Sequence, residues 1–374
     1  MNKIYQLITS IQLGGAEIIA FNLAEHCAGE PGNNTEITIV ELYRTKNNYA
    51  KVKKRELTSK NIRLITLHRG GKRMFPIFAT IKLIYCIWKD KPSIVHSHTD
   101  LPDFVLSIAK RFFSFFRLAF PDVVRTIHST QLWHTHNKLG KISESAFNNE
   151  SIVAVSSFAM HAYEQLRKKY NLPVSANRRI IYNGSVVPGR HPHFFRIDKN
   201  KINIAFCGRF EDYKGMETLI PAISEVGRMF PNHFVFHIIG DGSYKCRLLQ
   251  LSQLLDNVYM YDPIPNVSSM IYAFDYLFMP SHFEGLPLTS IEASFSGVPV
   301  IAAHAPGLDE TLPENWPLKF HLENNDELYS IFENIKEKRY NKKELQQLAY
   351  NFISERFSLN KMVQSYNALY NKML

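Results

Sequence analysis

The feature that most constrains the fold is an alternation of strand-like and helix-like segments, which stops once and then starts again. In the first half, short apolar segments typical of strands begin at six positions: Lys3, Thr35, Ile62, Ser93, Val123 and Ile152. Helical spacing of apolar residues occupies 16–28 and 75–88 between them. Alternation of this kind predicts a parallel sheet covered by helices on both faces.

A stretch rich in Gly, Pro and polar residues begins at Asn183, and its composition predicts a linker. After it, strand-like segments begin at Ile202, His233, Tyr276 and Pro299. The 374 residues are more than a single α/β core usually holds, so two domains are expected. We predict a first domain at 1–187, a second at 188–357, and a helix at 358–374 that packs back onto the first. Two such doubly wound domains bind ligands at the carboxyl ends of their strands.

Composition narrows the classes of function. No apolar run reaches the roughly 18 residues of a membrane span, and the first residues read as a strand rather than a signal peptide, so a cytoplasmic protein is expected. Residues 1–187 carry 26 Lys and Arg against 13 Asp and Glu, whereas the remainder carries 18 against 21. A basic half suggests an anionic partner. No nucleic-acid-binding motif is present, which favours an anionic membrane over nucleic acid.

The segment Gly14-Gly15-Ala16-Glu17 follows the first strand and opens the first helix. Glycines there allow a ligand to approach the backbone, and a helix amino terminus favours an anion. A plain tight turn explains the same residues equally well. The G-x-G-x-x-G spacing is absent, which argues against an NAD-dependent oxidoreductase.

Two cations mark the next crossing from strand to helix. Arg209 follows a strand, and Lys214 begins the next helix. Such a pair suits a diphosphate, since an arginine can donate two parallel hydrogen bonds. The alternative is a pair of solvated surface cations.

The segment from Pro280 to Ala293 is the most informative. Glu284 lies on a loop after a strand, and the loop ends at a helix amino terminus whose free N–H groups could hold phosphate oxygens. Glu292 follows Leu288 by one helical turn and so shares its face. Carboxylates at these positions could accept hydrogen bonds from ribose and sugar hydroxyls. Each Glu alone could equally be an ordinary loop or first-turn acid.

Together these motifs resemble the retaining glycosyltransferases of family 4, the glycosyl transferases of group 1. The resemblance covers most of the chain and rests on motifs in the family's order: GGAE at 14–17, HSH at 96–98, TIH ending at His128, NG at 183, GRFEDYKG from 208, GDG at 240 and the pair Glu284 and Glu292. It implies the GT-B fold, an α/β arrangement of two Rossmann-like domains facing each other across a cleft. One departure follows Pro299, where the family's glycine-rich stretch is replaced by HAPGLDETLPENW.

The resemblance also implies the chemistry. The donor would be a nucleotide-diphosphate sugar, with no cofactor and no metal ion in the site. Arg209 and Lys214 would hold the diphosphate, Glu292 the ribose and Glu284 the sugar, with Gly15 against the diphosphate. The predicted donor-binding residues are Gly14, Gly15, Arg209, Lys214, Gly240, Glu284, Gly285, Leu286, Leu288, Thr289 and Glu292. The predicted catalytic residues are His128, Glu284, Arg209 and Lys214, and the predicted acceptor-binding residues are His96, His98 and His128.

The expected activity is transfer of a sugar, with retention of configuration, to a hydroxyl of a glycan or lipid-linked acceptor in bacterial surface polysaccharide synthesis. Two alternatives stay open: a sugar-nucleotide epimerase or hydrolase of the same fold, and a non-catalytic scaffold that binds nucleotide sugars. A metal site built from the pairs His96/His98 and His134/His136 is a further, weaker alternative.

Cations and aromatic rings alternate from Lys110 to Arg117, within the basic half. A segment of this kind can lie on an anionic membrane, or it can be the buried end of a helix. The first reading predicts peripheral contact with the inner face of the cytoplasmic membrane.

Overall fold

The computed structural model describes residues 2–27, 35–70, 75–134 and 136–374. The chain divides into two compact units, one made of Met1–Asn183 with Asn360–Leu374 and the other of Gly184–Leu359. Within the described residues, no helix combines the length and the apolar character needed to cross a bilayer.

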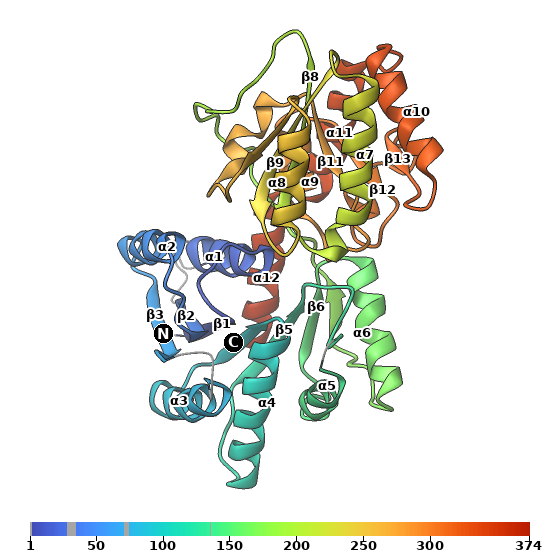
Figure 1. Ribbon diagram of the computed structural model, residues 1–374. Helices are drawn as coiled ribbons and strands as arrows, with labels where there is room; N and C mark the ends of the chain where they lie inside the picture. The colour runs from blue at the N-terminus through green and yellow to red at the C-terminus, as the bar shows by residue number, and fades with distance from the viewer. Residues whose placement is uncertain (1, 28–34, 71–74, 135) are drawn as a thin grey trace. The chain divides into compact units, whose positions relative to one another are not determined.

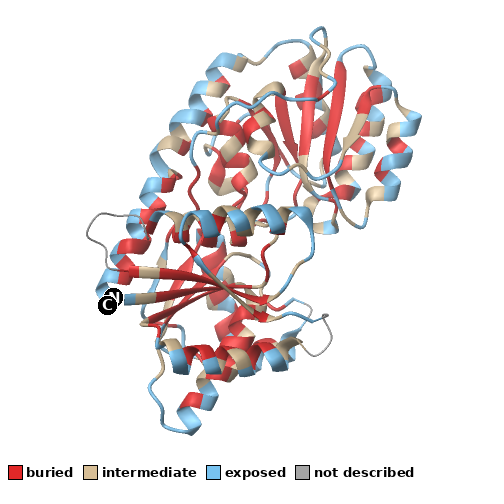
Figure 2. Ribbon diagram, turned by 90° about the vertical axis from the view of Figure 1, so that its left-hand side faces the viewer, coloured by how far each residue is buried: buried red, intermediate tan, exposed pale blue. Residues whose placement is uncertain are grey.

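The first unit is built on a seven-stranded sheet whose strands all run parallel, in the order β3-β2-β1-β4-β5-β6-β7. The strands are β1 (Asn2–Ile8), β2 (Thr35–Tyr43), β3 (Arg63–His68), β4 (Ile94–His98), β5 (Asp122–Ile127), β6 (Ser151–Ala154) and β7 (Arg178–Ile180). The central strands are almost wholly buried, as expected for a parallel sheet that is covered on both faces. Figure 2 shows the contrast between the buried strands and the exposed outer faces of the helices.

The helices of this unit are α1 (Gly15–Cys27), α2 (Asn48–Ser59), α3 (Phe75–Asp90), α4 (Asp100–Phe115), α5 (Asn137–Glu144), α6 (Ser157–Lys169) and α12 (Leu359–Met373). Helices α1 and α2 lie on one face of the sheet, and α3 and α4 lie on the other (Figure 1). Tyr5 and Leu7 of β1 pack with α3 and α4, whereas Gln6 between them points to the opposite face and reaches α12.

The second unit repeats the design with six parallel strands in the order β10-β9-β8-β11-β12-β13. These are β8 (Ile202–Arg209), β9 (Phe234–Asp241), β10 (Val258–Tyr261), β11 (Tyr276–Met279), β12 (Val300–Ala303) and β13 (Lys319–Phe320). The helices are α7 (Met216–Met229), α8 (Lys245–Leu254), α9 (Leu288–Phe295), α10 (Asn325–Lys336) and α11 (Lys342–Arg356), with short 3₁₀ turns η1 (Asp212–Lys214), η2 (Val267–Ala273) and η3 (Asp309–Thr311).

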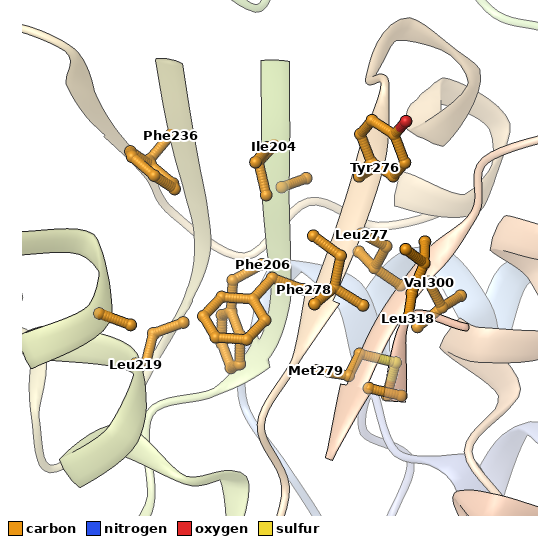
Figure 3. Close-up of a cluster of buried hydrophobic side chains, with 14 of the residues drawn as sticks. Ile204, Phe206, Leu219, Phe236, Tyr276, Leu277, Phe278, Met279, Val300 and Leu318 are labelled. Carbon is orange, nitrogen blue, oxygen red and sulfur yellow. The ribbon is translucent and has the colours of Figure 1, made fainter. Parts of the chain in front are cut away.

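The core of the second unit is rich in aromatic residues. Figure 3 shows Phe206 of β8, Phe236 of β9 and Phe278 of β11 among aliphatic side chains from both faces of the sheet. Burial of one such side chain stabilises the fold by about 1.5–3 kcal/mol.

The predicted linker after Asn183 contains no helix or strand up to β8, only a single bridge that pairs Ser185 with Ser358. Both residues of this bridge belong to the second unit, near its two ends along the chain. The contact division falls after Asn183, close to the predicted domain boundary at 187, and places residues from Asn360 onward in the first unit.

Candidate functional site

The predicted donor residues of the second unit gather at the carboxyl edge of its sheet. Arg209 is the last residue of β8, Lys214 ends the turn η1, and Glu284 lies in the loop between β11 and α9. Because all six strands run parallel, these loops emerge at one edge, where α/β sheets bind ligands.

Close backbone contacts join these loops to one another. Gly215 has a φ of +74°, and a Cβ atom there would lie 1.8 Å from the Pro280 carbonyl oxygen. The amide of His282 donates to the carbonyl of Tyr213 at 2.9 Å, and the amide of Glu284 donates to the carbonyl of Pro306 at 2.8 Å. Only a glycine satisfies both the space and the backbone angle at 215, so this residue fixes Lys214 beside the Glu284 loop.

Lys214 and Glu284 form an ion pair across this junction. The Lys214 Nζ atom donates to Glu284 Oε1 at 2.6 Å, and the Ser281 hydroxyl donates to the same oxygen at 2.8 Å. The pair is mostly buried, with 18% and 9% of the two side chains exposed. These two contacts to one oxygen hold the Glu284 carboxylate in one orientation.

Arg209 is differently placed. Its guanidinium lies over the ring of Tyr213, 5.3 Å from the centroid, and that ring stacks on Phe283. Arg209 is exposed and forms no ion pair with any residue that the structure describes. The stacked rings of Tyr213 and Phe283 thus position the Arg209 guanidinium, and its N–H groups stay available to an anion.

Glu292 lies on α9, with Ser185 and Cys207 close by. Burial of its carboxyl raises the pKa to about 7, and the Ser185 hydroxyl, 3.5 Å from Oε1, lowers it. The charge of Glu292, after burial, contributes to raising the pKa of the Cys207 thiol to about 12. The carboxyl of Glu292 thus changes its charge near neutral pH.

The remaining predicted donor residues contribute mainly backbone atoms to the site. Leu286 and Leu288 are buried, Gly285 and Thr289 are half-buried, and no side chain caps the first turn of α9, whose N-cap is Pro287. Gly240 has a φ of +152°, and a Cβ atom there would lie 1.9 Å from the carbonyl oxygen of Gly208. Close packing of β8 on β9 therefore accounts for this glycine.

In the first unit, Gly14 and Gly15 open α1 as predicted, and they differ in their surroundings. A Cβ atom at Gly14 would lie 2.3 Å from a carboxylate oxygen of Glu17, whereas at Gly15 it would meet no atom within 4 Å. The first glycine makes room for a buried carboxylate, and the second leaves open space where a ligand could reach the backbone.

The three predicted histidines form part of a buried hydrogen-bonded chain. His128 Nε2 lies 2.9 Å from His98 Nδ1, and His98 Nε2 lies 2.8 Å from Gln6 Oε1. Gln6 Nε2 donates to the hydroxyl of Tyr370 at 2.9 Å, which lies 2.6 Å from His96 Nδ1. His96 Nε2 lies 2.6 Å from the hydroxyl of Thr126. We call this hydrogen-bonded row of His128, His98, Gln6, Tyr370, His96 and Thr126 the histidine relay.

The orientation of Gln6 determines which atoms donate along the relay. Its oxygen accepts from His98 Nε2–H, so Nδ1 of His98 carries a lone pair and accepts from Nε2–H of His128. Burial lowers the pKa of His128 to about 3 and the pKa values of His96 and His98 well below their usual range, so all three rings are neutral. Nδ1 of His128 is then an acceptor, and within the described part of the chain it has no hydrogen-bond partner.

His96 and His98 are completely buried, with both ring nitrogens of each engaged in the relay. Of the three, only His128 lines a cavity of about 300 Å³ at the carboxyl edge of the first sheet. The structure therefore brings the predicted acceptor residues together as a row in which His128 alone can reach a ligand.

The cavity has a second polar wall that the sequence analysis missed. Asp100 lines it, and burial raises the pKa of this carboxyl to about 6, although the amide of Trp133 donates to it at 2.9 Å. Thr99, also in the wall, has a φ of +78°, which is strained for a β-branched residue. Strain of this kind concentrates at functional sites.

Beneath the cavity, four charged side chains form a buried cluster. Arg125 of β5 donates to Asp103 of α4 at 2.7 Å and to Glu144 of α5 at 3.1 Å. Arg167 of α6 donates to the Glu144 carboxylate at 3.2 Å and to its carbonyl at 2.6 Å. The cluster ties three helices to β5, the strand that ends one residue before His128.

No group of three His, Cys, Asp or Glu residues that could hold a metal ion occurs in the described ranges. His96 and His98 use both ring nitrogens in the relay, so the structure does not support a zinc site at this pair.

Several residues of both sites were not anticipated: Ser185, Tyr213, Ser281, Asp100, Gln6 and Tyr370. Two had a usable signal, since Asp100 lies two residues after the end of the HSH strand and Tyr213 lies between the two predicted cations. The others come from distant segments, and no local pattern in the sequence connects them to the site.

Comparison with known proteins extends these observations. Residues 201–335 match the family model described as glycosyl transferases group 1. Over 210 residues the chain is 28% identical to the O-antigen biosynthesis glycosyltransferase WclY of Escherichia coli, an alignment that covers 53% of this chain and 57% of WclY. It is 26% identical over 221 residues to an uncharacterised 41.2 kDa protein of the cps region of Klebsiella pneumoniae. That alignment covers 56% of this chain and 60% of the relative. The chain thus spans little more than half the length of these relatives.

Among solved structures, Anabaena Alr3699/HepE in complex with UDP and glucose superimposes with a TM-score of 0.78 over 100% of both chains, at 17% identity. This likeness, with the two parallel sheets and their alternating helices, confirms the predicted fold class. The chain therefore has the α/β GT-B fold, and residues 201–335 of its second unit match the glycosyl transferases of group 1.

Proposed function

We propose that this protein is a glycosyltransferase that moves a sugar from a nucleotide-diphosphate sugar to a hydroxyl of a glycan or lipid-linked acceptor. The observation that carries the proposal is the grouping of Arg209, Lys214 and Glu284 at one edge of the second sheet. An accessible cation beside a carboxylate with a fixed orientation suits a ligand that has a diphosphate next to a polyhydroxyl group.

The comparisons support the donor class. The structural neighbour was solved with UDP and glucose, and WclY is named for O-antigen biosynthesis. We therefore favour a UDP-sugar as donor and bacterial surface polysaccharide as the pathway, in the cytoplasm near the inner face of the membrane. We assign the diphosphate to Arg209, Lys214 and the first turn of α9, the ribose to Glu292, and the sugar hydroxyls to Glu284.

In the proposed reaction, the bond between the anomeric carbon and the diphosphate oxygen breaks, and UDP leaves with the electron pair. The acceptor hydroxyl oxygen bonds to the same carbon, and its proton passes to the leaving phosphate. Attack from the face of departure retains configuration and needs no metal ion, because Arg209 and Lys214 stabilise the growing phosphate charge.

We assign the acceptor to the cavity of the first unit. Nδ1 of His128 would accept a hydrogen bond from the acceptor hydroxyl and orient it. With a pKa of about 3, His128 would stay neutral throughout the physiological range. Asp100, which has a higher pKa of about 6, is the second group available to a hydroxyl there.

The test is a screen of the purified protein against UDP-, GDP- and ADP-sugars, following thermal stabilisation and release of nucleoside diphosphate. The Arg209→Gln variant should lose the stabilisation, whereas Arg247→Gln, which removes a surface cation paired with Glu217, should keep it. Failure of every nucleotide sugar to stabilise the protein would overturn the proposal. Analysis of the sugar product distinguishes transfer from the alternatives, since a free or epimerised sugar indicates a hydrolase or epimerase, and binding without turnover indicates a scaffold.

A further inference from the structure

Helix α3 is apolar on two faces. Its inner face buries Ala79, Leu83 and Ile87 against the sheet. Its outer face exposes five large apolar side chains, each between 51% and 61% accessible: Ile77, Phe78, Ile81, Tyr85 and Trp88. Surface helices of globular proteins normally present polar residues on the outer side.

The end of α4 continues this exposed apolar area. Phe112, Phe115, Phe116 and Leu118 are exposed, and Phe115 is 81% accessible. Helices α3 and α4 pack against each other on the same face of the sheet (Figure 1). Each leads from the carboxyl end of one strand to the amino end of the next, so their last turns, with Trp88 and Phe115, lie at the same edge. We call these nine residues the α3/α4 surface.

The two segments that carry this surface contain charges of one sign, while Glu150 pairs with Lys110 and Asp122 is exposed at the same edge of the sheet. Neither 75–89 nor 104–121 contains an acidic residue, and Lys89, Arg111 and Arg117 are exposed within them. Asp90, the acid at the end of α3, forms an ion pair with Arg63 at 2.8 Å and accepts a hydrogen bond from the hydroxyl of Tyr5. A second copy of the chain would bring cations against cations across a two-fold interface, which disfavours self-association. Anionic lipid headgroups complement the same cations.

We propose that the α3/α4 surface docks on an anionic phospholipid membrane. The aromatic rings of Trp88, Phe115 and Phe116 enter the headgroup layer, where such rings are favoured, and the cations contact lipid phosphates. The surface extends well beyond the segment Lys110–Arg117 and lies outside both the donor residues and the His128 cavity. Docking therefore does not depend on the proposed transfer chemistry.

The protein carries its own reporter for this test. Trp133 and Trp316 are each only 3% exposed, so Trp88 is the tryptophan that a membrane can reach. We expect the full chain to float with vesicles that contain phosphatidylglycerol, and its fluorescence to shift to the blue. Vesicles of phosphatidylcholine alone, or high salt, should weaken binding at least several-fold, because the headgroup attraction is electrostatic.

Variants make the test specific. The double variant Ile81→Glu/Phe115→Glu should lose flotation, whereas Leu254→Glu, which changes an apolar side chain exposed on the second unit, should keep it. Trp88→Phe should float but lose the blue shift. Equal flotation of the double variant and the wild type, or no flotation of the wild type at low salt, would overturn the proposal. A dimer of the wild type in the absence of vesicles, detected by light scattering and lost in the double variant, would also overturn the proposal. A thermal shift with nucleotide sugar, unchanged in the double variant, separates this result from the donor site.

Discussion

The carboxyl edges of the two sheets are built on different principles. In the second unit, the edge carries two cations: Arg209 is exposed and Lys214 is half-buried. Both belong to a sequence motif from which they could be predicted. In the first unit, the edge carries a row of three neutral histidines whose pKa values are lowered by burial, beside Asp100. One edge can act by attraction to charge, and the other by the direction of its hydrogen bonds. The predictions below test this contrast.

The largest effect is expected from the charges of the first unit, which serve the fold rather than a ligand. Glu144→Gln removes the charge shared by Arg125 and Arg167 and should lower the free energy of unfolding by about 3–5 kcal/mol. Urea denaturation followed by circular dichroism measures it. Glu217→Gln, an exposed acid of the second unit, is the control and should change stability little. Similar losses in both variants would remove the contrast.

In the second unit, charge should serve the reaction. Arg209→Ala should lower kcat by about 10²–10³-fold, because in the proposed reaction this cation would stabilise the charge that grows on the leaving phosphate. Its thermal midpoint without ligand should stay close to that of the wild type, and Arg247→Ala should retain activity. A rise in KM with kcat unchanged would show that Arg209 only binds the donor.

Glu292 should make donor binding depend on pH. Its pKa of about 7 in the free protein means that the carboxyl is largely protonated at about pH 6, whereas ribose hydroxyls need the ionised form as acceptor. Affinity for a UDP-sugar should therefore fall about tenfold from about pH 8 to about pH 6. Calorimetry with the intact nucleotide sugar measures this, since its diphosphate diester does not titrate in the range. Glu292→Gln should bind more weakly at high pH and show a flat profile. A sloping profile in that variant would assign the titration to another group.

The smallest effect is expected from the relay. Tyr370→Phe removes the hydroxyl that accepts from Gln6, so the amide can turn and the ring proton of His128 is no longer confined to Nε2. A loss of about 1 kcal/mol predicts a fall of about fivefold in kcat/KM for the acceptor. Nitrogen chemical shifts of His128 should show a mixture of tautomers.

Tyr366→Phe is the matched control, since that hydroxyl contacts Thr126 at the end of the relay. It should leave the His128 tautomer unchanged. If Tyr370→Phe gave the same nitrogen shifts as the wild type, Tyr370 would be only a packing residue.

The same contrast explains how much could be read from the sequence. The alternation of strands and helices predicted the fold class, because a parallel sheet imposes a regular apolar pattern on each strand. Weakly patterned elements escaped: α2 is largely polar, and β7 and β13 have three and two residues. In the second unit, Arg209, Lys214 and Glu284 were proposed together because their motifs resemble those of a known family and follow its order along the chain.

The first site was less accessible to this reasoning. His96, His98 and His128 were identified, but the hydrogen bonds of His96 and His98 depend on Tyr370 and Gln6, which lie 364 residues apart. Local spacing carries no information about such a contact. The position of Asp100 just after the HSH strand was a usable signal, but its raised pKa arises from burial, which the residues around it do not reveal.

The pairing of α12 with the first sheet has a consequence for synthesis. On the ribosome, Tyr366 and Tyr370 are made only after the entire second unit, although Gln6 and His96 appear early. Until then, the first unit has polar side chains in its interior without their native partners, a costly state. We expect the first unit to reach its final stability only after translation of the second. A fragment of residues 1–183 should be less stable than the first unit of the full chain.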